Sequence, residues 1–415
     1  MKQIAVIGLG YIGLPTAILA AKSGYDVLGF DVDESKICKI KNGDPSIIEP
    51  QIKENLLDVL SSEKFEVSSI LKPADCFIVA VPTPFKEGKK ADLSFVFSAA
   101  KSIAKVLKKD DLIILESTIP VGTTELVAEF LERESGLVAK KDFLVAHCPE
   151  RVLPGRIFYE LVKNDRVVGG IDQESCNAAK KFYAAFVEGD IHTTDDKTAE
   201  MVKLVENSSR DVQIAFANQV AAMARDAKID PYEVINLANR HPRVKILNPG
   251  CGVGGHCIAV DPWFLIESFP KSTTLLQSAR DVNDLRPREI INEVSKLVEK
   301  IKQEKNILKV KVLVLGLTFK PGVDDLRESP ALKIAKDLNL QKDVDLFACE
   351  PNVTSEKISH LGFLSTALNE GLKNCDLIVS LVLHKEFKNI PLNIIQSKLI
   401  IDTCGLIHEL ERGKE

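Results

Sequence analysis

Short apolar runs alternate with helical patterns through the first half of the chain. Runs that are typical of strands buried on both faces occupy residues 3–7, 26–30, 75–81, 112–116, 143–146 and 167–170. Stretches with helical periodicity separate most of them. The alternation predicts an α/β domain with a parallel sheet over residues 1–195.

The pattern changes near residue 198. Residues 198–227 keep a helical pattern without a glycine or a proline, and about 30 residues predict a helix of roughly 45 Å. A second helix is expected to begin at Pro231, with Asp230 as its N-cap. Residues 196–303 are therefore predicted to form a helical central domain, and a helix of such length can link two domains and form a dimer interface.

Apolar runs return in the last part of the chain, at residues 310–315, 344–348, 377–381 and 399–401. They predict a second α/β domain over residues 304–415, without a full G-x-G-x-x-G motif. The predicted fold class is thus α/β, with two Rossmann-like doubly wound domains joined by a helical middle domain with a long central helix.

The composition argues against several classes of protein. The 415 residues carry a net charge of −5 without a basic block, which disfavours nucleic acid as a partner. No apolar run approaches the roughly 20 residues that span a membrane, and no basic leader is visible. The nine cysteines lack metal-site spacing, so no metal is expected, and an odd number without a disulfide framework indicates reduced thiols in the cytoplasm.

A glycine motif follows the first expected strand. Gly8, Gly10 and Gly13 form G-x-G-x-x-G between a strand and a helix, and Asp31 ends the next strand. The glycines let a pyrophosphate approach the backbone at a helix N-terminus. Asp31 can accept both ribose hydroxyls, and an acid there disfavours the extra phosphate of NADP. The motif in this context predicts an NAD site rather than a structural turn.

Polar side chains stand where later strands are expected to end. Thr83, Thr118 and Glu150 each follow a predicted strand, and open α/β sheets bind ligands at this edge. Either threonine could instead be a helix N-cap, and Glu150 could be an exposed turn charge. Beside the glycine motif, contact with a cofactor or substrate is favoured for the two threonines.

The candidate nucleophile is Cys257, in a glycine-rich stretch. Three glycines, at positions 252, 254 and 255, precede it, and Asp261 follows. Glycines let a bulky group lie close to the backbone, and a thiolate presented there can attack an electrophilic carbon. The alternative is a buried cysteine beside a tight turn.

The expected long helix places polar residues on one side. Lys203 and Asn207 are four residues apart and Arg210 lies three residues further on, so the three side chains share a side of the helix. By itself, Lys203 would be interpreted as an exposed surface lysine.

Seven motifs, in this order, make the chain resemble the UDP-glucose/GDP-mannose dehydrogenase family over essentially its whole length. They are GLGYIGLP (8–15), VPTP (81–84), ESTIPVGTT (116–124), PERVLPG (149–155), AEMVKLVENSSRD (199–211), GVGGHCIAVDPW (252–263) and GLTFKPGVDDLRESP (316–330). RHPR (240–243) and GGHCIAVDPW are most similar to the branch that acts on UDP-N-acetyl-D-mannosamine. The UDP-glucose branch usually has a lysine where this chain has Val260.

The resemblance implies a four-electron oxidation, in which the C6 alcohol of a nucleotide sugar becomes a carboxylate and two NAD⁺ are reduced. Cys257 would hold the aldehyde as a thiohemiacetal and then as a thioester. Lys203 and Asn207 would stabilise the oxyanions, and Lys203 or Asp261 would assist the first hydride transfer. Asp261, Glu150 or Thr118 would position the hydrolytic water, and the choice among them stays open.

The resemblance also implies binding residues. Those that would contact NAD are Gly8, Gly10, Tyr11, Ile12, Gly13, Asp31, Thr83, Thr118 and, from the second α/β domain, Arg327. Those that would bind the UDP-sugar are Arg151, Val152, Lys203, Asn207, Arg210, His241, Arg243, Gly254, Phe319 and Lys320. His241 and Arg243 would reach the site of a neighbouring subunit in a homodimer or larger homo-oligomer. His241 could instead be a cation at its own helix end.

Other functions remain as alternatives. The same chemistry could act on UDP-N-acetylglucosamine, UDP-glucose or GDP-mannose. A two-electron hydroxyacid dehydrogenase would need neither Cys257 nor a second α/β domain, and it would yield one NADH per substrate instead of two. A non-enzymatic cofactor-binding protein would be expected to lack some of the reactive residues. The family resemblance further implies a role in supplying polysaccharide precursors.

Overall fold

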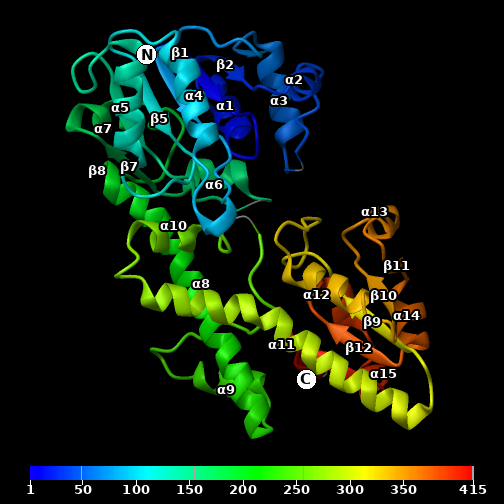
Figure 1. Ribbon diagram of the computed structural model, residues 1–415. Coiled ribbons are helices and arrows are strands. Elements are labelled where there is room, and N and C mark those ends of the chain that lie inside the picture. Colours follow the sequence, from blue (N-terminus) through cyan, green and yellow to red (C-terminus); the bar gives the residue numbers. More distant parts are fainter. Residues whose placement is uncertain (48, 154, 256, 414–415) are drawn as a thin grey trace. The chain divides into compact units, whose positions relative to one another are not determined.

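The computed structural model describes residues 1–47, 49–153, 155–255 and 257–413. The chain divides into two compact units (Figure 1). The first consists of Met1–Glu206 with Trp263–Pro270, and the second of Asn207–Pro262 with Lys271–Glu415. Each unit contains one sheet.

The sheet of the first unit has the strand order β3-β2-β1-β4-β5-β6-β7-β8. Its strands are β1 (Gln3–Ile7), β2 (Asp26–Phe30), β3 (Phe65–Ser68), β4 (Cys76–Val79), β5 (Leu112–Leu115), β6 (Leu144–His147), β7 (Arg166–Gly170) and β8 (Ile191–Asp195). Neighbouring strands are parallel except for β6 and β7. The order reverses between β1 and β4, so the carboxyl ends of these strands form the crevice where such sheets bind ligands.

Helices cover both faces of this sheet. They are α1 (Gly13–Lys22), α2 (Glu34–Lys41), α3 (Ile52–Ser61), α4 (Ser94–Ala104), α5 (Thr123–Ser135), α6 (Ile157–Lys163) and α7 (Gln173–Tyr183), with a 3₁₀ turn at Glu87–Lys89. Side chains of α1, α3, α6 and α7 share one core with alternate residues of β1, and those of α4 and α5 share the other. Both faces of β1 are therefore apolar, which explains its continuous apolar run.

Four helices follow the first sheet in the chain. They are α8 (Asp196–Ala227), α9 (Pro231–Ala238), α10 (Asp261–Ser268) and α11 (Thr274–Lys305). The predicted long helix is confirmed by α8. The predicted cap is also confirmed, because the side chain of Asp230 accepts a hydrogen bond from the N–H of Tyr232 and Pro231 begins α9. None of the helices in the described part of the chain is long and apolar enough to cross a membrane.

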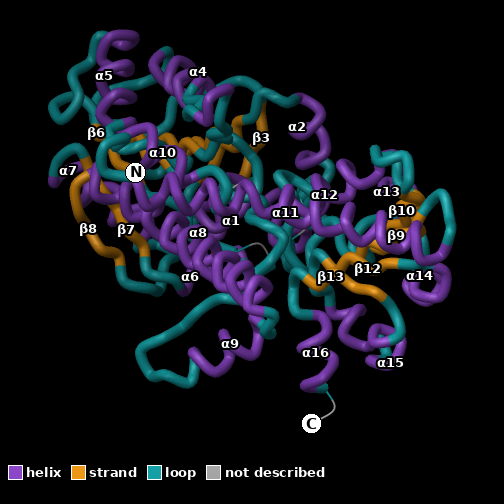
Figure 2. The backbone as a smooth tube through the Cα atoms, turned by 60° about the horizontal axis from the view of Figure 1, so that its bottom comes forward, coloured by secondary structure: helices purple, strands orange, loops and turns teal. Residues whose placement is uncertain are grey.

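The second sheet is parallel throughout, with the order β11-β10-β9-β12-β13. Figure 2 shows four of its strands, β10, β9, β12 and β13. Its strands are β9 (Val310–Leu315), β10 (Val344–Cys349), β11 (Leu364–Ser365), β12 (Leu377–Ser380) and β13 (Leu399–Asp402). Its helices are α12 (Pro330–Asn339), α13 (Ser355–His360), α14 (Leu368–Asn374), α15 (Leu392–Gln396) and α16 (Leu406–Arg412), with a 3₁₀ turn at Lys385–Asn389. The predicted fold class is confirmed.

Three strands were not predicted from the sequence pattern, namely β3, β8 and β11. All three lie at the edge of a sheet. The side chains of β8 are exposed or half-buried along its whole length, and β11 has only two residues. An edge strand pairs on one side only and is often short and polar, so it produces no continuous apolar run.

Candidate active site

The turn between β1 and α1 has the geometry of a dinucleotide-binding loop. Gly8 has a φ of +93°, and a Cβ there would lie 2.5 Å from the carbonyl oxygen of Ala80. A Cβ at Gly13 would lie 1.9 Å from the carbonyl oxygen of Gly8, whereas Gly10 has open space beside it. No side chain caps α1, so its N-terminus can receive a phosphate. The cradle fits the pyrophosphate of NAD.

Asp31 lies at the end of β2 and is only 6% exposed. Its carboxylate accepts hydrogen bonds from the N–H of Leu9 at 2.9 Å, the N–H of Asp33 at 3.0 Å and Nζ of Lys36 at 2.8 Å. Burial would raise the pKa of Asp31, but these hydrogen bonds outweigh burial and hold the pKa below its ordinary value. The group is therefore a carboxylate at neutral pH, ready to accept ribose hydroxyls. The sequence motif did not identify Lys36.

Thr83 and Thr118 lie together, after β4 and β5. Oγ1 of Thr83 donates to the carbonyl oxygen of Thr118 at 2.6 Å. Neither residue is a helix N-cap, since Leu93 and Gly122 precede α4 and α5. The N-cap interpretation is therefore wrong, and the two threonines tie the loops at the ligand edge of the sheet.

Glu150 follows β6 and is buried, with 7% exposure. Its carboxylate accepts hydrogen bonds from Nη1 of Arg166 at 3.0 Å and from the N–H of Arg151 at 2.6 Å. The interpretation of Glu150 as an exposed turn charge is wrong. Arg166, which is 4% exposed, was not found from the sequence, because nothing in a β-strand pattern marks the partner of a distant carboxylate.

The stretch before Cys257 is packed closely in the second unit. A Cβ at Gly254 would lie 2.5 Å from the carbonyl oxygen of Glu328, and a Cβ at Gly255 would lie 2.9 Å from the ring of Phe319. The N–H of Gly255 also donates to the carbonyl oxygen of Arg327 at 3.1 Å. Glycine is required here because the backbone of the loop touches the segment that carries Phe319.

Cys257 occupies the turn that leads into α10. Its carbonyl oxygen accepts hydrogen bonds from the N–H groups of Val260 at 3.0 Å and Asp261 at 2.8 Å. The cysteine is half-buried. Asp261, at 3% exposure, accepts a hydrogen bond from Nδ2 of Asn207 at 2.5 Å. Two predicted site residues, Asn207 and Asp261, are thus brought into contact across 54 positions of the chain, and both lie in the same unit as Cys257.

A buried polar network fixes the beginning of the cysteine loop. The N–H of Gly250 donates to Oδ1 of Asn218 at 2.9 Å, and Nδ2 of Asn218 donates to Oδ1 of Asn283 at 3.0 Å. Asn283 and Arg280 of α11 both donate to Asp211 of α8, at 2.8 Å and 2.7 Å. The loop is therefore anchored where α8 and α11 meet.

The other predicted residues vary in exposure. Lys203 is half-buried on α8, one turn before Asn207. Those that are half-buried are Ile12, Val152, Phe319 and Lys320, and those that are exposed are Tyr11, Arg210, His241, Arg243 and Arg327. Arg151 pairs with Glu206 at 2.5 Å and Arg327 with Asp325 at 2.7 Å.

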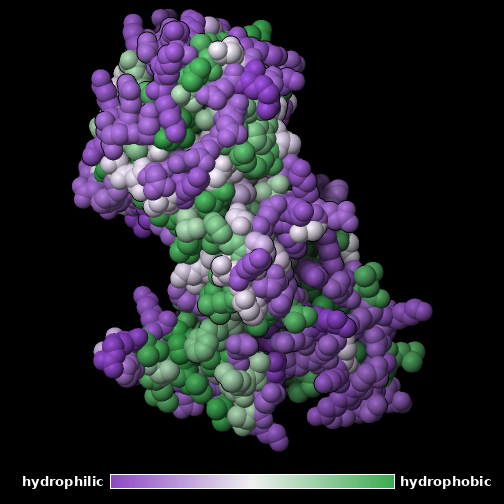
Figure 3. Space-filling model, turned by 60° about the vertical axis from the view of Figure 1, so that its left-hand side comes forward, coloured by the Kyte–Doolittle hydropathy of each residue, from purple (hydrophilic) through white to green (hydrophobic). Residues whose placement is uncertain are grey.

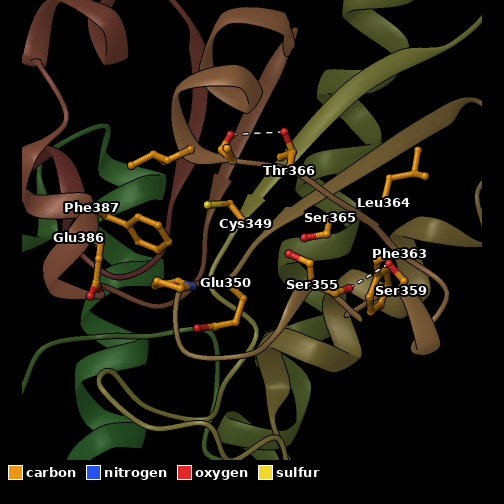
Figure 4. Close-up of a pocket in the computed structure, with 13 residues that line it drawn as sticks. Cys349, Glu350, Ser355, Ser359, Phe363, Leu364, Ser365, Thr366, Glu386 and Phe387 are labelled. Carbon is orange, nitrogen blue, oxygen red and sulfur yellow. Dashed lines mark hydrogen bonds between the residues drawn. The ribbon is translucent and has the colours of Figure 1, made fainter. Parts of the chain in front are cut away.

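A cavity of about 620 Å³ lies elsewhere in the second unit, beside the carboxyl ends of β10 and β11 (Figure 4). Ser355, Ser365 and Thr366 are among its lining residues. It contains none of the residues predicted from the sequence motifs, so it is separate from the candidate nucleophile.

Three family models match successive parts of the chain. They describe the UDP-glucose/GDP-mannose dehydrogenase family: its NAD binding domain matches residues 2–187, its central domain residues 197–285, and its UDP binding domain residues 313–409.

Individual relatives match over nearly the full length. The chain is 43% identical to the UDP-N-acetyl-D-mannosamine dehydrogenase of Escherichia coli (strain K12), over 97% of this chain and 98% of the relative. It is 40% identical to the NDP-N-acetyl-D-galactosaminuronic acid dehydrogenase of Ralstonia nicotianae, over 98% and 96%. The solved structure of the UDP-D-ManNAc dehydrogenase from Pyrococcus horikoshii is similar with a TM-score of 0.87 and 43% identity, over 98% of this chain and 96% of that one.

Proposed function

Because the chain belongs to the UDP-glucose/GDP-mannose dehydrogenase family, we propose that it oxidises C6 of UDP-N-acetyl-D-mannosamine to the carboxylate, giving UDP-N-acetyl-D-mannosaminuronate. NAD is its cofactor, and the chain is a nucleotide-sugar dehydrogenase. The observation that carries the proposal is the arrangement of Cys257 in a tight glycine turn ahead of Asp261, which Asn207 contacts.

The first oxidation produces the aldehyde. Lys203 or Asp261 takes the proton of the C6 hydroxyl, directly or through water, as C6 loses a hydride. NAD, when bound, is the acceptor of the hydride in this oxidation and in the second one. Glycines 8, 10 and 13 and the carboxylate of Asp31 hold the cofactor.

Cys257 keeps the aldehyde bound between the two oxidations. Its thiolate adds to the aldehyde carbon, and the oxygen takes up a proton to give a thiohemiacetal. Loss of the second hydride from C6, with transfer of the hydroxyl proton to water, leaves a thioester. Asn207 and Lys203 stabilise the negative oxygen of the tetrahedral species, as oxyanion-hole donors do. The contact of Asn207 with Asp261 supports this role, because it fixes the direction of the amide.

Hydrolysis releases the product. Water adds to the thioester carbonyl, the carbon–sulfur bond breaks, and Cys257 leaves as the thiol. Asp261, Glu150 and Thr118 are the proposed groups that position the water. The ion pair of Glu150 with Arg166 supports a charged carboxylate at that position.

A second candidate substrate is favoured by one observation. The chain is 40% identical to a relative that is named for NDP-N-acetyl-D-galactosaminuronic acid. Both candidates are nucleotide derivatives of N-acetylhexosamines, and pockets often separate such similar sugars by only about 1–3 kcal/mol.

The test is the NADH yield on a panel of limiting nucleotide sugars with excess NAD⁺. The panel holds the UDP derivatives of N-acetylmannosamine, N-acetylgalactosamine, N-acetylglucosamine and glucose. We expect two NADH per UDP-N-acetyl-D-mannosamine and little from the others. Two NADH from another sugar would keep the chemistry and replace the substrate. One NADH from every active sugar would overturn the thioester route.

We also propose that the protein works as a homodimer in the cytoplasm. Hydrophilic side chains cover much of the face shown in Figure 3, with hydrophobic groups between them. Large apolar side chains nevertheless stay exposed along α8: Met201, Val205, Phe216 and Met223. The eight cysteines other than Cys257 are free thiols in the described part of the chain, which supports a reducing compartment.

A further inference from the structure

Both sheets end their second strand in an acid that holds the loop after the first strand. In the first unit this acid is Asp31. It accepts a hydrogen bond from Leu9, the residue after the first glycine, and another from Asp33, two positions further on. Its third donor is the flexible side chain of Lys36, which can move aside for a ligand.

Glu350, at the end of β10, repeats this arrangement in the second unit. Its carboxylate accepts hydrogen bonds from the N–H of Leu317 at 2.7 Å, again the residue after a glycine, and from the N–H of Asn352 at 2.9 Å. Gly316 has a φ of +88°, similar to the glycine after β1. Glu350 also holds the N–H of Thr318 at 3.1 Å.

Glu350 differs from Asp31 in having a buried histidine as a partner. The side chains of Glu350 and His384 are both 0% exposed, and Nε2 of His384 lies 3.1 Å from Oε2 of Glu350. Nδ1 of His384 accepts a hydrogen bond from the N–H of Gly322 at 3.3 Å, which leaves Nε2 as the donor to the carboxylate. Glu350 lines the cavity of Figure 4, but its side chain is 0% exposed and its carboxylate is held by His384 and the N–H groups of the loop, so it offers no free oxygen to a nucleotide ribose.

The histidine thus joins both ends of one loop. It reaches Gly322 at one end and, through Glu350, the N–H groups of Leu317 and Thr318 at the other. Oγ1 of Thr318 also lies 3.3 Å from its ring. Residues 316–322 are consequently closed into a fixed shape by two buried side chains.

This loop carries Phe319 and Lys320, the predicted contacts of the uridine diphosphate. The ring of Phe319 also packs against the cysteine loop, where a Cβ at Gly255 would come within 2.9 Å of it. The shape of the loop therefore sets where both side chains point and what supports the turn before Cys257.

We propose that His384 and Glu350 are positioning residues, which hold the loop of residues 316–322 in the form that binds the UDP part of the substrate. The inference rests on the proposed function, since it assigns UDP to this loop. In the second sheet, the acid at the position that binds ribose in a dinucleotide-binding fold instead holds a loop of the protein.

The test measures the Kd of UDP and the Kd of NAD by calorimetry on the full chain. His384→Ala removes the support, and His384→Gln keeps a donor and an acceptor. His360→Ala, an exposed histidine on α13 with 76% exposure, is the matched control. We expect His384→Ala to weaken UDP binding about tenfold or more, His384→Gln to restore most of the affinity, and NAD binding to stay unchanged.

Two results would overturn the inference. One is a folded His384→Ala variant with the UDP affinity of the parent protein. The other is an equal loss of UDP and NAD affinity with a lower unfolding midpoint, which would give His384 a general structural role. A parent protein that does not bind UDP would instead refute the proposed function itself.

Discussion

Individual cysteines in this chain differ in chemical environment. Cys251 is 6% exposed, and burial raises the pKa of its thiol to about 12, so it stays a thiol at neutral pH. Cys257, six positions later, is half-buried in the turn that starts α10. Only a thiolate with access to a ligand can act as a nucleophile, and the surroundings of Cys257 meet the access condition that those of Cys251 do not.

Replacing Cys257 by serine should stop formation of the free acid. A serine hydroxyl at neutral pH is a far weaker nucleophile than a thiolate, so we expect the rate to fall on the order of 10³-fold or more. Release of the uronate is measured by chromatography, with Cys38→Ser, an exposed thiol, as the control that keeps activity. Turnover of Cys257→Ser at the parent rate would rule out covalent catalysis.

Motifs in the sequence identified the candidate side chains but not how they pair. Asn207 and Asp261 are 54 positions apart, and Glu150 is 16 positions from Arg166. Such contacts depend on how strands and helices are brought together, which no local pattern encodes. The roles assigned to these residues remain predictions, while the pairs explain how each group is oriented.

Among the elements, α5 begins without a cap of its own. Its N-cap is Gly122, which has no side chain. Glu200 of α8 replaces the cap, because its carboxylate accepts hydrogen bonds from the N–H of Gly122 at 2.5 Å and from the N–H and hydroxyl of Thr124 at 2.7 Å and 2.6 Å. A distant carboxylate thus fixes the segment that carries Thr118.

This cap should make stability depend on pH. Burial raises the pKa of Glu200 to about 7, against the opposing effect of its hydrogen bonds. A raised pKa in the folded state means that its contribution is present at low pH and is lost as the pH rises through about 7. Relative to Glu200→Gln, the free energy of unfolding of the parent should fall by about 2 kcal/mol between about pH 5.5 and 8.5.

Urea denaturation of both proteins across this pH range measures the difference. Burial also raises the pKa of Glu116 to about 7, but that group is present in both proteins and its effect cancels. A difference that does not change with pH would show that Glu200 titrates normally in the folded state.

The contact of α8 with α11 depends on a buried ion pair. Arg280 and Asp211 are each 1% exposed, with Nη1 and Oδ1 2.7 Å apart. Replacing Arg280 by methionine leaves the carboxylate of Asp211 buried without its cation, which should cost about 3–5 kcal/mol of the free energy of unfolding.

The double variant Arg280→Met, Asp211→Asn separates the causes. It removes the unpaired charge as well, so it should recover a large part of the loss when both variants are unfolded in urea. Equal losses in the single and double variants would place the cost in side-chain packing and not in the isolated charge.

In the whole molecule, the same sheet topology occurs twice. The order β11-β10-β9-β12-β13 repeats β3-β2-β1-β4-β5 of the first sheet. This architecture was predictable from the sequence, because the central strands of both sheets are buried on two faces and give apolar runs. The edge strands β3, β8 and β11 were not, and the residue bounds of the three expected domains remain a prediction.

Four large apolar side chains are exposed along one side of α8. Met201, Val205, Phe216 and Met223 of α8 are 36%, 48%, 51% and 59% exposed. Their spacings of four, eleven and seven residues are each close to a whole number of helical turns, so the four side chains lie in one stripe. Exposed apolar stripes of this kind mark sites of protein association.

Replacing Phe216 by aspartate puts a charge in the middle of this stripe. If two copies meet there, sedimentation should show the 45.7 kDa chain as a monomer, whereas Gln303→Lys, an exposed change on α11, should leave the dimer intact. Activity then separates the two interpretations of His241. A monomer without activity fits a site that needs His241 and Arg243 from a neighbour, whereas an active monomer favours a role of His241 within its own subunit, near the end of α9. A Phe216→Asp protein that stays dimeric would remove the stripe as the interface.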